Sequence, residues 1–153
     1  MANVTGMCTS FKQDLLNGLH AFGTTVVRGA TTADTFYGAL YYVSGSLGVG
    51  TGAYSVTSEI TGGVGYTAAG KTMGSWVAPS TASGGAFTTP SASVVWTTMT
   101  QSTAFDTLLV YNNTAAGKNA VSVHNFGSQT ITANNFTLTM PTNAFGTALI
   151  QIS

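Results

Sequence analysis

The stretch Phe105–Phe126, FDTLLVYNNTAAGKNAVSVHNF, restricts the possible folds of this chain more than any other. Residues 105–111 are apolar and aromatic, as in a strand that is buried on both faces. Residues 112–119 contain the Asn and Gly that tolerate positive φ, and they predict a turn. Residues 120–126 then alternate valine with polar side chains, the period of a half-buried strand. Because a two-stranded hairpin cannot bury an apolar face alone, the rest of the chain must supply a covering sheet.

Several other segments carry the β-branched and aromatic residues that predict strands, with Gly, Pro, Ser or Asn at their ends. Helices that would connect parallel strands are missing between them. We therefore predict an all-β fold, an antiparallel β-sandwich or jelly-roll-like domain with one short N-terminal helix. Loops are expected at 80–85 and 101–103, and strands at 24–28, 35–43, 71–78, 86–89 (an edge strand before Pro90), 93–98, 129–132, 136–140 and 148–152.

The short helix is predicted at Ser10–Gly18. The Ser10 hydroxyl can cap a free backbone N–H, and Gln13 follows three residues later, as in a capping box. Phe11 and Leu15 fall on one apolar stripe with the other leucines of the segment. A helix of this length must dock that stripe, so we expect it to cover one end of the sandwich; a helix that binds a partner protein is the alternative.

The chain carries unusually little charge. Only 5% of its residues are Asp, Glu, Lys or Arg, where about 25% is usual. A near-neutral surface of Thr, Ser, Asn and Ala suits a protein that rests against other protein, and a soluble β-domain that tolerates low charge is the simpler alternative. No change of composition marks a linker, so we predict an N-terminal arm at residues 1–9 and one β-sandwich domain at residues 10–153.

The composition and motifs argue against several classes of function. We expect no nucleic-acid partner, because Lys and Arg do not cluster, and no membrane partner, because no apolar run approaches the roughly 18 residues of a spanning helix. No signal peptide is recognisable, which favours synthesis in a cytoplasm. His20 and His124 lie far apart, and the single cysteine, Cys8, is expected to be a small buried residue. Without a G-x-S-x-G elbow or a zinc or calcium ligand pattern, we predict no enzyme activity, no cofactor and no metal.

One acidic residue stands in an otherwise uncharged stretch, SEITGGVGY. We expect this residue, Glu59, to accept backbone N–H bonds from the glycine-rich loop, or to pair with Lys71 or Arg28. Aromatic residues such as Trp76 and Trp96 could line a sugar-binding face, but positions in the core or in an interface explain most of them more simply.

Several motifs together resemble a family of small structural proteins that tailed bacteriophages encode in their virion gene clusters. The motifs are FKQDLLNG, SEITGGVGYTAAG, the hairpin YNNTAAGKNAVSVHNFG, FTLTMP and the closing ALIQI, and they cover most of the chain. Asn125 stands where the family commonly has Asp, and residues 78–90 make a longer segment than in the shorter members. The matching residues are Phe11, Lys12, Leu15, Leu16, Gly18, Glu59, Gly62, Gly65, Tyr66, Gly70, Tyr111, Asn112, Phe126, Gly127 and Pro141.

The resemblance implies a β-sandwich virion component, most simply a capsid decoration (cement) protein that binds the assembled capsid surface and bridges capsomers. Its partners would be the major capsid protein and further copies of itself, as a dimer or trimer, in a virion made in the bacterial host cytoplasm. The alternatives are a tail, adaptor or fibre component, or a carbohydrate-binding β-sandwich module. The side chains expected at partner contacts are Val4, Met7, Phe11, Leu15 and, at the hairpin tip, Lys118.

Overall fold

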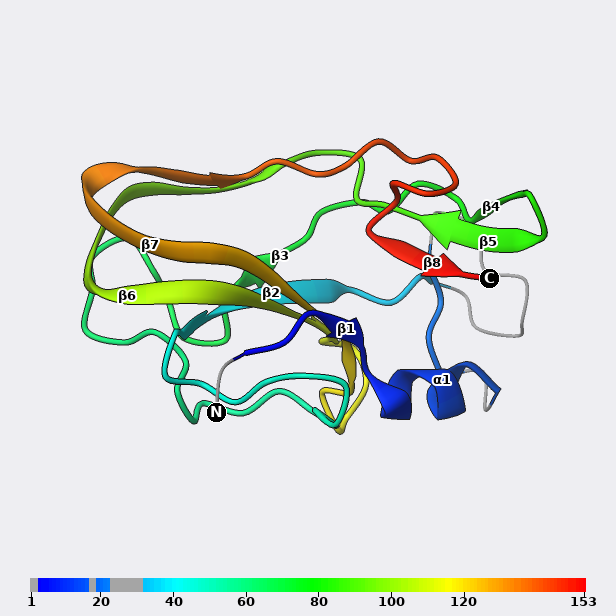
Figure 1. Cartoon of the computed structure of the whole chain (residues 1–153), viewed down its shortest axis with the longest axis horizontal. Coiled ribbons are helices and arrows are strands. Elements are labelled where there is room, and N and C mark those ends of the chain that lie inside the picture. Colours follow the sequence, from blue (N-terminus) through cyan, green and yellow to red (C-terminus); the bar gives the residue numbers. More distant parts are fainter. Residues whose placement is uncertain (1–2, 17–18, 23–31) are drawn as a thin grey trace.

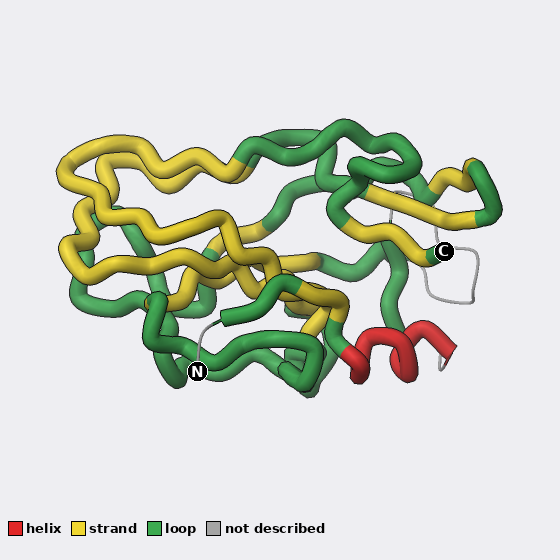
Figure 2. The backbone as a smooth tube through the Cα atoms, in the orientation of Figure 1, coloured by secondary structure: helices red, strands yellow, loops and turns green. Residues whose placement is uncertain are grey.

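A computed structural model describes residues 3–16, 19–22 and 32–153. Its strands form two antiparallel sheets, a five-stranded sheet in the order β1-β7-β6-β2-β3 and a three-stranded sheet in the order β4-β5-β8 (Figures 1 and 2). This arrangement confirms the predicted all-β, sandwich-like fold with one short helix. The elements are β1 (Gly6–Met7), α1 (Thr9–Leu16), β2 (Phe36–Tyr42), β3 (Lys71–Thr72), β4 (Ser80–Ala82), β5 (Gly85–Thr88), β6 (Val94–Asn112), β7 (Ala120–Leu138) and β8 (Ile150–Ile152).

The predicted hairpin is confirmed, and it is longer than expected. β6 and β7 are 19 residues each and stay paired from the turn out to Val94 and Leu138. The sequence prediction of separate strands at 93–98, 129–132 and 136–140, with a link at 101–103, is therefore wrong. These segments continue the same two strands because irregularities in register and positive φ angles at Thr98 and Ala133 bend the ladder without ending it.

The bend folds the ribbon back over itself, as Figure 1 shows for β6 and β7. We call residues 105–112 with 120–126 the inner ribbon, and residues 94–104 with 127–138 the outer ribbon. The ring of Phe136 in the outer ribbon lies 5.1 Å from that of Phe105 and 5.5 Å from that of Phe126, which belong to the inner ribbon. The hairpin thus supplies part of its own cover, and aromatic contacts hold the two layers together.

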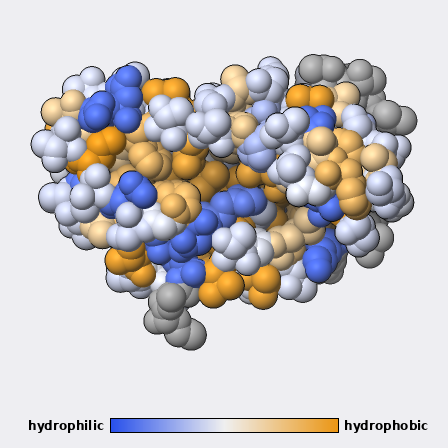
Figure 3. Space-filling model, turned by 45° about the horizontal axis from the view of Figure 1, so that its top comes forward, coloured by the Kyte–Doolittle hydropathy of each residue, from blue (hydrophilic) through white to orange (hydrophobic). Residues whose placement is uncertain are grey.

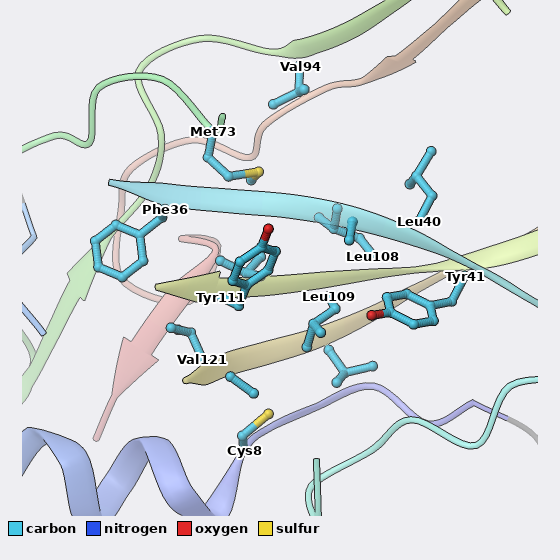
Figure 4. Packing of buried hydrophobic residues seen from close by; sticks show 14 of the residues in the cluster. Cys8, Phe36, Leu40, Tyr41, Met73, Val94, Leu108, Leu109, Tyr111 and Val121 are labelled. Carbon is cyan, nitrogen blue, oxygen red and sulfur yellow. The ribbon is translucent and has the colours of Figure 1, made fainter. Parts of the chain in front are cut away.

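The inner ribbon pairs with β2 and is covered on both faces. Figure 4 shows Met73 and Val94 on one side of these strands and Cys8 on the other. β2 lies close to its cover because Gly38 has no side chain: a Cβ there would lie 2.7 Å from the Met73 sulfur. The prediction that residues 105–111 are buried on both faces is confirmed from 107 to 111, where every residue is buried.

The N-terminal residues 3–8, expected in an arm, pack into the domain. β1 pairs with β7, and the Asn3 amide donates to the Tyr42 carbonyl at 3.0 Å and to Asp106 Oδ1 at 2.8 Å. The helix begins at Thr9, one residue earlier than predicted. Ser10 is not its cap, because its hydroxyl donates to the backbone carbonyls of Thr51 and Gly52 at 3.5 Å. The predicted helix end at Gly18 and the predicted strand at 24–28 lie outside the described residues.

Strand β5 lies at the centre of the small sheet, the three-stranded sheet formed by β4, β5 and β8. It pairs with β4 on one side and with β8 on the other, so its prediction as an edge strand is wrong. Pro90 does not interrupt the ladder because β5 ends at Thr88. The expected loop at 80–85 contains β4. Of the predicted strand 71–78, Lys71–Thr72 forms β3, and Trp76 adds an isolated bridge to Pro90. Within the described part of the chain, no helix has the length and apolar character needed to cross a membrane.

Two glycines of the loop TGGVGYTAAG give a matched test of this packing. Both have positive φ, +74° at Gly62 and +75° at Gly70. A Cβ at Gly62 would meet nothing within 4 Å, whereas one at Gly70 would overlap the carbonyl oxygen of Gly38 in β2. We expect Gly62→Ala to lower the free energy of unfolding by about 1 kcal/mol, the cost of the left-handed backbone alone. Gly70→Ala should lower it by more than about 3 kcal/mol. Urea denaturation of both variants measures this, and equal losses would contradict the close packing.

Candidate functional site

Three of the five predicted contact residues gather at one place, between α1 and β8. Met7 and Leu15 line a groove of about 510 Å³ there, with Lys12, Gln151, Ile152 and Ser153. An adjoining pocket of about 230 Å³ reaches inward and is lined by Phe11, Leu15, His20, Phe22, Pro79, Ala86, Phe87, Thr88, Ile150 and Ile152. We call the two together the helix groove. Its walls are mainly apolar, which suits contact with an apolar side chain of a partner.

The five residues differ in what they offer to a partner. Phe11 is fully buried, so its ring belongs to the core, while Met7 and Leu15 are half-buried. Val4 is 60% exposed but lies away from the groove, and its N–H donates to the Leu47 carbonyl. The Lys118 amine donates to the backbone and side-chain oxygens of Asn113 at 2.7 and 2.8 Å, so it closes the hairpin turn on itself.

Charge is segregated along the chain in a way that composition alone does not reveal. All charged residues fall within 12–71 and 106–118, so residues 72–105 and 119–153 contain none. The fold brings these two uncharged segments together, because they form the outer ribbon, the small sheet and the connections between them. Figure 3 turns the upper side of Figure 1 toward the reader, and much of that surface is pale, with apolar patches between. The exposed side chains of the outer ribbon include Thr97, Thr98, Ser102, Thr103, Ser128, Gln129, Thr130, Thr132, Asn134, Asn135 and Thr137.

Glu59 is the buried acid of the domain, and it acts as predicted from its glycine-rich surroundings. Its carboxylate accepts the backbone N–H of Ala69 at 2.8 Å and the hydroxyls of Tyr54 and Tyr66 at 2.6 Å each. The alternative pairing with Lys71 is wrong, because that amine donates to a backbone carbonyl of β6; Arg28 lies outside the described residues. Burial first, and then the hydrogen bond and charge of Glu59, raise the pKa of both tyrosines. This is a structural clamp on the loop, since every carboxylate oxygen is occupied by a donor.

The two histidines stand in separate polar settings. His20 Nε2 lies 3.5 Å from Asp14 Oδ2, and its Nδ1 lies 3.1 Å from the Asn112 amide, which also donates to Asp34 Oδ2. These bonds join α1 and the segment after it to the tip of the hairpin. His124 shares a 2.8 Å hydrogen bond with the Ser122 hydroxyl, and burial lowers its pKa to about 4. Its imidazole is therefore neutral at pH 7.

Among the described residues, the tryptophans that could have lined a sugar-binding face are buried, and no cluster of metal ligands is found. No group of three or more His, Cys, Asp or Glu in residues 3–16, 19–22 and 32–153 is placed to hold a metal ion. Trp76 and Trp96 are each less than 5% exposed and pack in the core. Sequence reasoning found part of the helix groove through the apolar stripe of the helix. It missed the contribution of β8, because the pairing of β8 with β5 joins positions more than 60 residues apart.

In comparisons with known proteins, no family model, no curated protein and no solved structure matches the chain.

Removing the Glu59 carboxylate should destabilise the domain strongly. Glu59→Ala leaves one buried amide and two tyrosine hydroxyls without their acceptor, and we expect a loss of about 3 kcal/mol or more in the free energy of unfolding. Tyr54→Phe removes one of the three donors and should cost about half as much. Because the folded-state tyrosine pKa values lie above the unfolded value of about 10, stability should also fall as the pH rises above 10. Denaturant titrations at pH 7 and pH 11 test both expectations, and equal losses for the two variants would refute the clamp.

His124 should make the domain less stable in mild acid. Its folded-state pKa of about 4 lies below the unfolded value of 6.5. Between these values the unfolded chain binds the proton and the folded chain does not, so stability falls as the pH drops through this window. His124→Gln removes this contribution, and the difference in unfolding free energy between pH 7 and pH 4.5 should be smaller in the variant. An identical difference in both proteins would show that His124 is solvated in the folded state.

Proposed function

We infer that this chain is a virion structural protein of a tailed bacteriophage, and that it decorates the capsid as a cement protein. The observation that carries the proposal is the uncharged outer layer, in which the outer ribbon and the small sheet hold no Asp, Glu, Lys or Arg. Its exposed polar side chains are Thr, Ser, Asn and Gln instead. The resemblance of the sequence motifs to small virion proteins supports the same function.

A neutral surface costs less free energy to cover than a charged one. Burying a charged group loses its hydration and requires a matched partner, whereas hydroxyl and amide groups need only a hydrogen bond. A protein that spends its functional life against a large assembly therefore gains from a layer without charge. Binding to the assembled capsid, and not to the free subunits, would stabilise the shell by mass action.

The helix groove supplies an apolar contact beside that layer. Ile152 in β8 lies on its rim, is 43% exposed, and comes from the uncharged segment 119–153. Lys12 on the opposite wall is the charged residue that lines it. A capsid protein that inserts an apolar side chain here would contact the small sheet and α1 at once. Copies of this chain would then be fixed in orientation on the capsid surface.

A tail, adaptor or fibre component would use the same surfaces with fewer copies, so copy number separates the two functions. The carbohydrate-binding alternative is less favoured, because Trp76 and Trp96, the rings that would stack on a sugar, lie in the core.

The proposal predicts many copies on each particle, comparable in number with the capsomers, and capsids that break at lower temperature when the chain is missing. Quantitative mass spectrometry of purified particles and thermal release of the packaged genome measure these quantities. A few copies confined to one vertex would indicate the tail or adaptor function instead.

A pair of variants tests the groove. Ile152→Asp places a charge on its rim and should weaken binding to particles that lack the chain by at least tenfold, because the carboxylate must be desolvated on contact. Val56→Asp is the matched control, since Val56 is 66% exposed and does not line the groove. Equal binding by the two folded variants would exclude the groove from the contact.

A further inference from the structure

The outer part of β7 is a long strand edge that no other described residue covers. β1 pairs with β7 only at Ser122 and Val123, and beyond that point, in residues 3–16, 19–22 and 32–153, β6 is the strand that pairs with it. In Figure 1 this part of β7 runs along the upper margin of the molecule. The other strands at sheet edges, β1, β3, β4 and β8, are only two or three residues long. Long uncovered edges are pairing sites unless charge, proline or a bulge protects them. The bend at Ala133 interrupts this edge, so residues 134–138 are the part of it that can pair with a further strand.

The opposite edge of the outer ribbon, formed by β6, is protected. The Lys71 amine donates to the Val95 carbonyl at 2.7 Å. Val64, in the glycine-rich loop, exchanges two backbone hydrogen bonds with Thr100, at 3.1 and 2.9 Å. The β6 side of the ribbon is therefore covered at Val95 and at Thr100.

The backbone geometry identifies where those groups point outward. Val95 lies opposite Thr137, and the Val95 carbonyl points away from β7 because it accepts the Lys71 amine. In an antiparallel ladder the two residues of such a pair both turn their N–H and C=O away from each other. The N–H and C=O of Thr137 therefore face the open edge. The neighbouring outward N–H, that of Asn135, is already taken by the Asn134 side chain at 2.8 Å.

The side chains next to this point are incompletely covered. Phe136 and Leu138 point toward the inner layer, and both are only half-buried although they pack against the core. Their positions on an edge strand account for this, because no strand lies beyond them. A further strand at this edge would bury more of both.

We propose that a second copy of this chain pairs with this edge, antiparallel and across a two-fold axis at Thr137, so that the two Thr137 residues exchange their backbone hydrogen bonds. The occupant is another copy because the edge is complementary to itself. Residues 119–153 contain no charged side chain, so no like charges meet when the segment faces its own copy. Pro141 follows the end of β7 and limits the paired length, because it lacks an N–H.

The pairing gives a weak, closed dimer. A contact of one short strand buries less than the roughly 1,200 Å² of a stable complex, so dissociation constants in the micromolar to millimolar range are expected. A two-fold contact uses the same edge on both copies and therefore stops at two. The inference does not depend on the proposed virion role, although it specifies the surface for the homo-oligomer within that proposal.

Sedimentation velocity of the full chain over rising concentration tests the dimer, with Thr137→Pro as the variant. Proline removes the outward N–H of Thr137 and leaves the hydrogen bonds between β6 and β7 intact, since this N–H is not part of that ladder. We expect the wild type to dimerise reversibly, and the variant to raise the dissociation constant at least tenfold with an unchanged melting temperature. A monomer at every concentration, or a trimer, would overturn the inference.

A pair of lysine variants tests the edge without altering the backbone. Thr137→Lys places two ammonium groups against each other across the axis and should abolish the dimer. Thr97→Lys puts the same charge on an exposed position of β6, the protected side, and should leave the dimer unchanged. Equal effects of the two variants would overturn the inference. A monomeric protein that still binds capsids would overturn the dimer and leave the virion function standing. A dimer that fails to bind capsids would support the dimer and overturn the virion function.

Discussion

The uninterrupted pairing of β6 with β7 is the constraint on which the rest of the structure depends. Both strands are 19 residues long, and one turn joins them, so a single hairpin forms the inner ribbon and then returns over it as the outer ribbon. The inner ribbon needs cover on both faces because residues 107–111 of β6 are all buried and four of these five are apolar or aromatic. The returning outer ribbon covers one face, and the N-terminal segment with Cys8 covers the other. The remaining elements close the ends of this frame.

The glycine-rich loop shows how a nearly uncharged chain fixes an irregular segment. Its glycines allow the loop backbone to lie directly against β2 and β6, where any side chain would collide. Glu59 then ties the loop from within through two tyrosine hydroxyls and one amide. The Tyr111 hydroxyl donates to the Ala69 carbonyl at 2.7 Å and joins the loop to β6. One buried carboxylate with three hydrogen-bond donors therefore fixes the conformation of this loop without an ion pair.

The sequence predicts the parts of this fold that are coded locally. The turn at 112–119 and the alternation after it are short-range signals, and the hairpin follows from them. Sequence patterns divide the outer ribbon into separate strands because the bends near Thr98 and Ala133 interrupt the period of two. They place β5 at an edge because its central position depends on β8, which comes much later in the chain. The sequence predicts only part of the helix groove for the same reason. Met7 and Leu15 follow from apolar patterning, whereas Ile152 reaches the groove because β8 pairs with β5. The uncharged layer cannot be predicted from the sequence until residues 72–105 and 119–153 are known to pack together.

The hydrogen bond from Lys71 to the Val95 carbonyl and the pairing of Val64 with Thr100 cover the β6 edge of the outer ribbon. A ribbon with two open edges adds a strand at each end, and each added copy offers a fresh edge to the next, which leads to fibres of unlimited length. When one edge is covered, pairing with a single further copy occupies the remaining open edge. Although the chain has few cationic side chains, the Lys71 ammonium group donates to a backbone carbonyl and not to a carboxylate. By covering one edge, it would limit edge-to-edge pairing to a dimer, whereas a ribbon with both edges open could polymerise.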